Sequence, residues 1–97
     1  MNYKQSRKLE MKRRQKALRA WLLATSTKHG LGLTAFEKDA RRSERSRVIA
    51  KAGTSVNSLI VAASRGRIGD DLQYRLKQAS VGEKNPLFAD DSESKTE

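Results

Sequence analysis

The side chains with the clearest chemical potential in this sequence are its cations. The 97 residues include 21 lysines and arginines against 11 acids, which gives a formal net charge of +10. Eight of these cations stand in the first 20 residues, where Glu10 is the single acid. Clustered cations of this kind attract polyanions and bind phosphate groups. The first candidate binding set is a basic arm that contains Arg7, Lys8, Lys12, Arg13, Arg14, Lys16 and Arg19.

The sequence offers few residues for metal binding, nucleophilic catalysis or membrane insertion. The chain has no cysteine and one histidine, so we expect no metal site, no cysteine nucleophile and no cofactor. No candidate nucleophile stands in a pattern with a base, and we therefore expect that the protein is not an enzyme. The sequence contains no run of about 18 apolar residues. We expect a cytoplasmic protein with no membrane partner.

The apolar residues indicate an all-α fold of four or five helices. One helical face, at spacings of i, i+3, i+4 and i+7, is formed by Leu18, Trp21, Leu22 and Thr25. Trp21 is expected to anchor the core of this domain. No such stripe precedes Ala17, so residues 1–16 are predicted to be the basic arm, either as a solvated helix or disordered. The helical domain is predicted to span residues 17–80.

Capping residues predict where the second helix begins and ends. Thr34, with Glu37 three residues later, is typical of a capping box. Gly53 can adopt the left-handed conformation that ends a helix. The highly charged stretch between them, from Lys38 to Arg47, fits a solvated helix or a loop equally well.

A short helix and a last helix follow Gly53. Thr54 and Ser55 are both good N-cap residues. The helix that they open, over residues 55–64, has an apolar face made of Val56, Leu59, Ile60 and Ala63. Asp70 and the acid beside it favour the start of the last helix, because carboxylates stabilise helix N-termini. Residues 81–97 lose the helical period and are predicted to be an acidic flexible tail.

A helix that ends in glycine, a tight turn and a second helix opened by Thr-Ser are typical of a helix-turn-helix. The stretch VIAKAGTSVNSLIVAASRGRIGDDLQYRLKQAS, within residues 45–80, resembles the lambda-repressor-like (Cro/CI-type) helix-turn-helix of phage and bacterial regulators. The resemblance covers about a third of the chain and is carried by Gly53, Leu59 and the Gly-Asp-Asp-Leu segment at 69–72. The chain departs from the family at Ile49, where alanine is usual.

The resemblance implies a compact helical domain that binds operator DNA as a homodimer and regulates transcription. Helix 55–64 would enter the major groove, and the groove-facing positions carried over are Ser55, Val56, Asn57, Ile60 and Val61. Asn57 can bond adenine through two hydrogen bonds, whereas the apolar members can only contact thymine methyl groups. The cations expected to contact backbone phosphates are Lys51, Arg65 and Arg67.

Two alternative functions remain open from the residues alone. The arm mixes arginine, lysine and glutamine like basic helices that bind RNA hairpins and fold on binding. The protein could thus be an RNA-binding or RNA-polymerase-associated accessory protein that acts through residues 4–19. High charge and a basic extension are also ordinary in a structural component of a ribonucleoprotein such as a ribosome.

Overall fold

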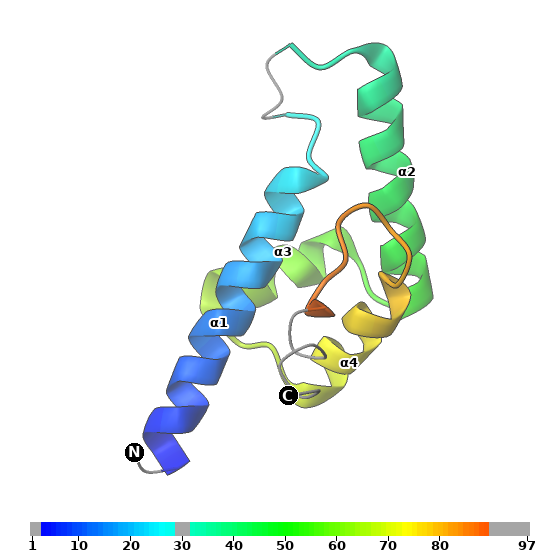
Figure 1. The fold of residues 1–97 in the computed structure, drawn as a ribbon. Coiled ribbons are helices and arrows are strands. Elements are labelled where there is room, and N and C mark those ends of the chain that lie inside the picture. The colour runs from blue at the N-terminus through cyan, green and yellow to red at the C-terminus, as the bar shows by residue number, and fades with distance from the viewer. Residues whose placement is uncertain (1–2, 29–31, 90–97) are drawn as a thin grey trace.

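The computed structural model describes residues 3–28 and 32–89. Within these ranges the chain is all-helical and has no strand. Its helices are α1 (Tyr3–Ala24), α2 (Ala35–Ala52), α3 (Val56–Arg65) and α4 (Asp70–Ala79). Helix α2 packs against α4, and α1 crosses α3 (Figure 1). The expectation of an all-α protein with four or five helices is confirmed.

Each of the four helices contributes to a single core. Leu18 and Trp21 of α1 are buried, and so is Leu59 of α3, which is fully inaccessible to solvent. The other apolar residues of this core are Val48, Ala52, Ala63, Ile68, Leu76, Ala79, Leu87 and Phe88. The predicted role of Trp21 as a core anchor is confirmed, since only 3% of its surface is exposed.

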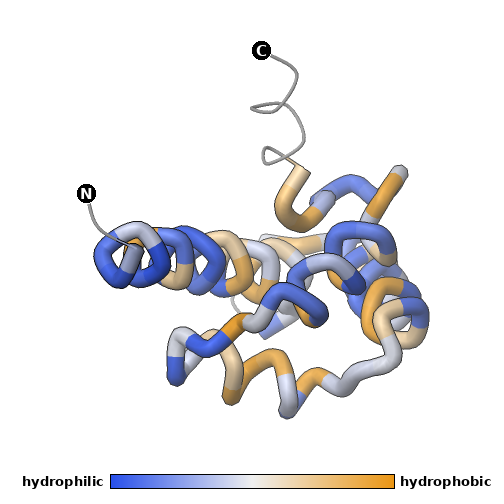
Figure 2. The backbone as a smooth tube through the Cα atoms, turned by 90° about the horizontal axis from the view of Figure 1, so that it is seen from below, coloured by the Kyte–Doolittle hydropathy of each residue, from blue (hydrophilic) through white to orange (hydrophobic). Residues whose placement is uncertain are grey.

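Helix α1 is longer than the apolar stripe indicated. It runs without a break from Tyr3 to Ala24 and crosses the boundary that was predicted at residue 17. Its first turns are mainly hydrophilic, as Figure 2 shows beside the N label. Arg14 lies within the predicted arm and is nevertheless buried, with 6% of its surface exposed. The predicted arm is therefore the first part of a helix that packs in the domain.

Local capping chemistry explains the limits of α2 and α3. The side chain of Thr34 accepts a hydrogen bond from the Glu37 amide, and the Glu37 side chain accepts one from the Thr34 amide, so the predicted capping box is confirmed. The stretch from Lys38 to Arg47 is helical throughout. Gly53 ends α2 in the left-handed conformation, at φ 68°. Ser55 then caps α3, and its Oγ accepts from the Ser58 amide.

The C-terminal segment 81–89 corrects the prediction of a flexible tail over residues 81–97. Within this segment, which we call the strap, Leu87 and Phe88 are buried. The Leu87 amide donates to Ser80 Oγ at 2.7 Å, and the Asn85 amide donates to the buried Glu44 carboxylate at 2.8 Å. The strap therefore belongs to the packed domain. The rest of the predicted tail, residues 90–97, lies outside the described residues.

Replacing Leu87 by alanine tests whether the strap stabilises the core. Leu87 is 2% exposed, and a leucine-to-alanine change at a buried site costs about 2–5 kcal/mol of unfolding free energy. We expect Leu87→Ala to lower the unfolding free energy by this amount in urea denaturation followed by circular dichroism. The control Val81→Ala changes an exposed side chain of the same segment and should stay within about 0.5 kcal/mol of the parent protein. Equal urea midpoints for Leu87→Ala and the parent protein would contradict a packed strap.

Candidate nucleic-acid interface

Helix α3 presents a narrow polar face to solvent. Leu59 and Ala63 point into the core. Asn57, Val61 and Ser64 are exposed and stand at i, i+4 and i+7, so they share the opposite face of the helix. This face combines an amide, a hydroxyl and one half-exposed valine. It can donate and accept hydrogen bonds and can also contact a methyl group.

The five positions carried over from the family resemblance do not all lie on this face of α3. Ser55 is occupied as the N-cap of α3, and its hydroxyl also donates to Ser58 Oγ at 3.0 Å. Val56 is half-buried, and Val56 and Ile60 line the hollow between α3 and the end of α1. Of the five positions, only Asn57 and Val61 line the open hollow on the outer side of α3.

Two serines were missed by the sequence analysis. Ser58 and Ser64 are exposed on α3, Ser58 beside Asn57 and Ser64 in line with it and Val61. The signal for Ser64 was present in the sequence, because a count of helical turns from Asn57 reaches it at i+7. The family resemblance directed attention to the start of the helix instead.

Arg65 and Arg67 lie beside the outer face of α3. Both are exposed, and together with Asn57, Ser58 and Val61 they line an open hollow of about 420 Å³. Within the part of the chain that the structure describes, no acidic side chain lines this hollow. Neither cation has an ion-pair partner among residues 3–28 and 32–89. An amide that can read a base edge and two cations that can bind phosphates are therefore brought together.

Lys51, the third predicted phosphate ligand, lies elsewhere. It is exposed in the last turn of α2. The pKa of Glu83 is lowered, mainly by a hydrogen bond from Arg47 and to a smaller extent by the charge of Lys51. Lys51 therefore lies near the strap. It does not line the hollow that holds Arg65 and Arg67.

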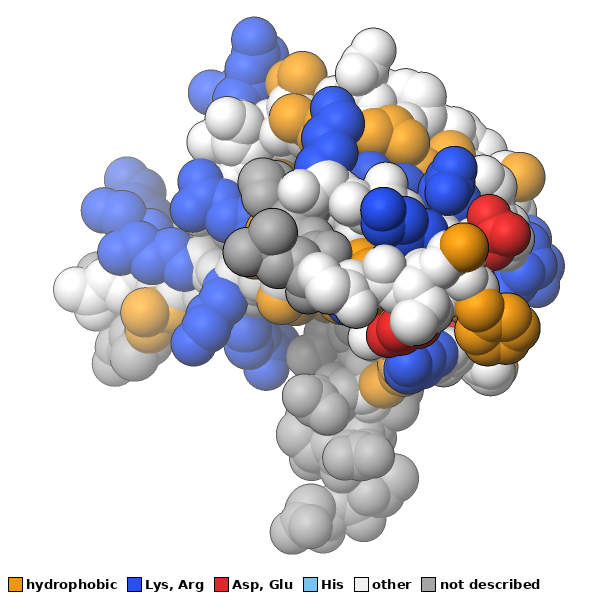
Figure 3. All heavy atoms as spheres, turned by 90° about the horizontal axis from the view of Figure 1, so that it is seen from above, with side chains coloured by type: hydrophobic (Ala, Val, Ile, Leu, Met, Phe, Trp, Pro, Cys, Tyr) orange, Lys and Arg blue, Asp and Glu red, His pale blue; other side chains and the backbone are white. Residues whose placement is uncertain are grey.

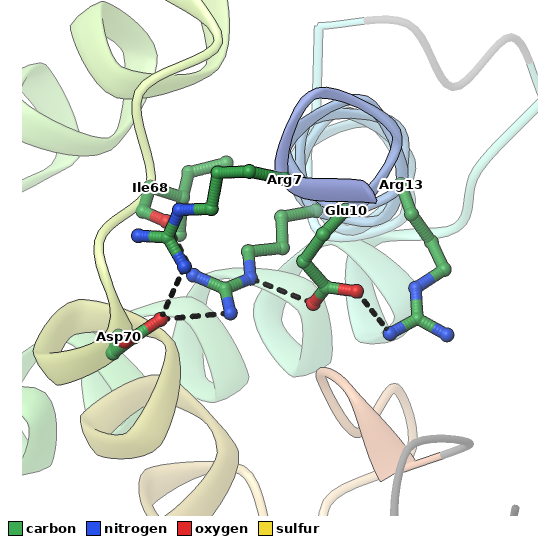
Figure 4. Close-up of polar contacts among 6 residues, drawn as sticks. Arg7, Glu10, Arg13, Ile68 and Asp70 are labelled. Atoms are coloured by element: carbon green, nitrogen blue, oxygen red, sulfur yellow. Dashed lines mark hydrogen bonds and ion pairs between the residues drawn. The ribbon is translucent and has the colours of Figure 1, made fainter. Parts of the chain in front are cut away.

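The arginines of the predicted arm are held by acids of the same domain. The guanidinium of Arg14 contacts Glu10 at 2.9 Å, Asp70 at 2.9 Å and the Ile68 carbonyl oxygen at 2.8 Å. Arg7 donates to the same Asp70 carboxylate at 3.2 Å, and Arg13 pairs with Glu10. Figure 4 shows Arg7 reaching from α1 toward Asp70 at the start of α4, with Arg13 on the opposite side of Glu10. Arg14 therefore positions helices, and its burial removes it from the surface that a polyanion could reach.

The pKa values in this network follow the same contacts. Partial burial alone would raise the pKa of the Glu10 carboxyl, but Arg14 and Arg13 hold that pKa below its ordinary value. Hydrogen bonds from Arg14 and Arg7 lower the pKa of Asp70. Burial alone would lower the pKa of Arg14, yet its bonds to Glu10 and Asp70 outweigh burial and raise it.

The remaining cations of the arm form an exposed row on α1. This basic strip, as we define it, consists of Lys8, Lys12, Lys16 and Arg19. Figure 3 shows Lys and Arg side chains gathered at the left, where the first half of α1 lies. Gln15 Nε2 donates to the Ala63 carbonyl oxygen at 2.7 Å and so fixes this part of α1 beside the end of α3. Gln15 is a positioning residue that the sequence analysis missed.

The described ranges offer neither a membrane span nor a metal site. None of the helices there combines the length and apolar character of a membrane span. No group of three or more His, Asp or Glu side chains there is arranged to hold a metal ion.

No family model, curated protein or solved structure matches the chain. The assignment of function therefore depends on the geometry of α1 and α3.

Replacing Asp70 by asparagine tests the network by its pH dependence. The lowered pKa of Asp70 means that its carboxylate stabilises the fold above about pH 4, the ordinary Asp value. This contribution is lost as the pH falls through the lowered native pKa. We expect Asp70→Asn to be less stable than the parent protein at pH 7, and the difference to shrink as the pH falls toward 2.

The control for this measurement is Asp71→Asn on the same turn, since Asp71 pairs with Arg75 within α4. Thermal melts at a series of pH values compare the three proteins. A stability difference for Asp70→Asn that is the same at pH 7 and at pH 2 would contradict the assigned role of the carboxylate.

Proposed function

We propose that this protein is a DNA-binding transcription regulator of phage or prophage type, with α3 as the helix that enters the major groove. The observation that carries this proposal is the hollow on the outer side of α3, where Asn57 lies with Arg65 and Arg67. Asparagine side chains can read the edge of an adenine, and arginine side chains bind backbone phosphates. The order of α2, the Gly53 turn and the Ser55-capped α3 supports a helix-turn-helix arrangement.

The proposed mechanism assigns each side chain a separate contact. Helix α3 has 10 residues. An α-helix with its side chains is about 10–12 Å across, which suits a groove about 12 Å wide. Asn57 bonds an adenine through its amide, and Val61 contacts a thymine methyl group. Arg65 and Arg67 bind phosphates that flank the groove. Asn57 and Val61 would thus recognise the base sequence, whereas Arg65 and Arg67 would bind phosphates whatever the sequence.

The basic strip adds phosphate contacts that do not depend on sequence. Its members stand on α1, which Gln15 holds against the end of α3. Lysines at intervals of four residues are about 6 Å apart along a helix, close to the spacing of phosphates along one strand. Together with Arg65 and Arg67 they give about six phosphate contacts, which cost roughly three decades of affinity between 50 and 200 mM salt. A homodimer would place two α3 helices on half-sites one turn of DNA apart.

A second candidate function is RNA binding through the first turns of α1. Lys4, Lys8 and Lys12 are exposed on the part of this helix that projects from the body of the molecule (Figure 1). Structured RNA offers phosphates on both sides of such a helix. The same lysines would then carry specificity, and Asn57 would have no part in binding.

The first test separates specificity from affinity. The probe is a duplex selected from random DNA by the parent protein, with a parallel selection from random RNA. We expect Asn57→Ala to lose about 1–3 kcal/mol of discrimination at one position of each half-site, with non-specific binding unchanged. We expect the double variant Lys12→Ala/Lys16→Ala to bind all sequences more weakly and to flatten the slope of log K against log salt by about two.

The matched control is Lys84→Ala, which removes one exposed cation from the strap and should change neither quantity. Fluorescence anisotropy at several salt concentrations provides both measurements. A salt slope near zero for the parent protein would rule out nucleic-acid binding. Unchanged discrimination by Asn57→Ala, together with loss of one selected RNA in Lys4→Ala/Lys8→Ala, would replace the DNA proposal with the RNA one.

A further inference from the structure

An open apolar groove runs between α1 and α3 on the side away from Arg14. Two adjoining hollows, of about 460 and 310 Å³, share Leu22, Leu23 and Ile60 as lining residues. Val56 lines one hollow and Ala63 lines the other. We call the surface made by these five residues the α1–α3 groove. Leu23 is 57% exposed and Ile60 49% exposed, so the groove leaves branched aliphatic side chains open to water.

The charges around the α1–α3 groove all have one sign. Arg19 lines one end and Lys28 the other, and both are exposed. Arg45 also lines the groove, but it is occupied by hydrogen bonds to Thr25 Oγ1 and the Leu22 carbonyl oxygen. No aspartate or glutamate of the described residues lines either hollow. The groove is thus an apolar floor between two available cations.

The aliphatic surface of the groove and the cations at its ends restrict which kind of ligand can bind there. A second copy of the chain in a symmetric contact would bring Arg19 and Lys28 against the cations of an identical rim, and like charges in such a contact repel. A nucleic-acid backbone would satisfy the cations but would leave the aliphatic floor without an apolar partner. An amphipathic helix with an apolar face and acidic flanks satisfies both, which is the recognition mode of a helix laid in a groove.

The length of the groove sets the spacing of the ligand. It follows α3 from Val56 to Ser64, which is about 12 Å at the rise of an α-helix. A ligand helix of two turns has apolar residues at i, i+3 or i+4, and i+7 over the same distance. We propose that the α1–α3 groove binds an acidic amphipathic helix of a partner protein through three such residues, with its carboxylates facing Arg19 and Lys28.

A consequence for regulation rests on the proposed function. Asn57 lines the wider hollow together with Ile60 and also lines the outer hollow that holds Arg65 and Arg67. A helix seated in the α1–α3 groove would lie beside the outer face of α3, which must enter the major groove, with Asn57 at the shared edge. The acidic partner therefore competes with DNA, and its glutamates occupy Arg19, which would otherwise face a phosphate.

The test uses a defined probe and the full chain without DNA. The probe is a helical peptide of about 16 residues with leucine at i, i+4 and i+7 and glutamate on the flanking positions. A control peptide of equal charge carries glutamine in place of the three leucines. Titration calorimetry in 150 mM salt, about physiological ionic strength, compares the two. We expect the leucine peptide to bind about tenfold or more tightly than the glutamine peptide.

Variants of the protein locate the site. We expect Leu23→Gln and Arg19→Glu each to weaken binding of the leucine peptide by about tenfold. Both side chains are exposed, so both variants should fold, as a thermal melt will check. Phe36→Gln removes another exposed apolar residue, on α2, and should leave binding unchanged. Equal binding of the two peptides, no binding of either, or an unchanged affinity in Leu23→Gln would overturn the proposal.

A separate titration examines competition. The leucine peptide is added to the protein bound to its selected duplex, and release of the duplex is followed by anisotropy. Release by the leucine peptide, and much less by the glutamine peptide, supports mutual exclusion at α3. If the peptide binds without releasing the duplex, the α1–α3 groove remains a peptide-binding site and the proposal that the peptide competes with DNA is wrong. Failure to select any duplex would count against the proposed DNA binding alone, since the calorimetric result stands without it.

Discussion

The arrangement of the helices depends on one buried guanidinium. Arg14 reaches from the middle of α1 to Glu10 on its own helix, to Asp70 at the start of α4 and to the carbonyl of Ile68 in the preceding turn. A buried cation is tolerated only when its hydrogen-bonding groups find partners. The fork shape of arginine allows these three contacts at once, which the single ammonium of lysine could not match. Because the turn before α4 also follows α3, this residue fixes α1 relative to both helices.

The sequence was sufficient where structure is decided by neighbouring residues. The two ends of α2 were predicted from Thr34 with Glu37 and from Gly53, because capping residues satisfy backbone groups only a few residues away. The sequence was insufficient for Arg14, although Arg14 stands four residues before Leu18 on the same helical face. Charge argues against burial, and the acid on α4 that permits it is distant in the sequence. Leu87 and Phe88 were missed for a related reason, since the glycine and proline around them are typical of loops and their burial depends on a space between helices.

The candidate site was predictable in part. The exposure of Asn57 and Arg65 follows from the period of α3 once Leu59 is known to point inward, whereas Arg67 lies beyond the end of this helix. The position of Ile60 could not be obtained in this way, because it depends on where α1 crosses α3. One short helix thus carries two surfaces of different character, a polar one on its outer side and an aliphatic one toward α1. The hydrogen bond from Gln15 to Ala63 holds α1 beside α3, next to the aliphatic surface.

The strap has a consequence for how the protein is made. Glu44 in α2 is joined to Asn85, and Leu87 packs in the same core as Leu18. These contacts link residues that are far apart along the chain, so forming them requires closure of long loops. A ribosome that synthesises the protein must release almost all of the described chain before Leu87 can reach its place. Until then α1 and α2 expose the surface that the strap later covers, and apolar surface left open during folding promotes aggregation.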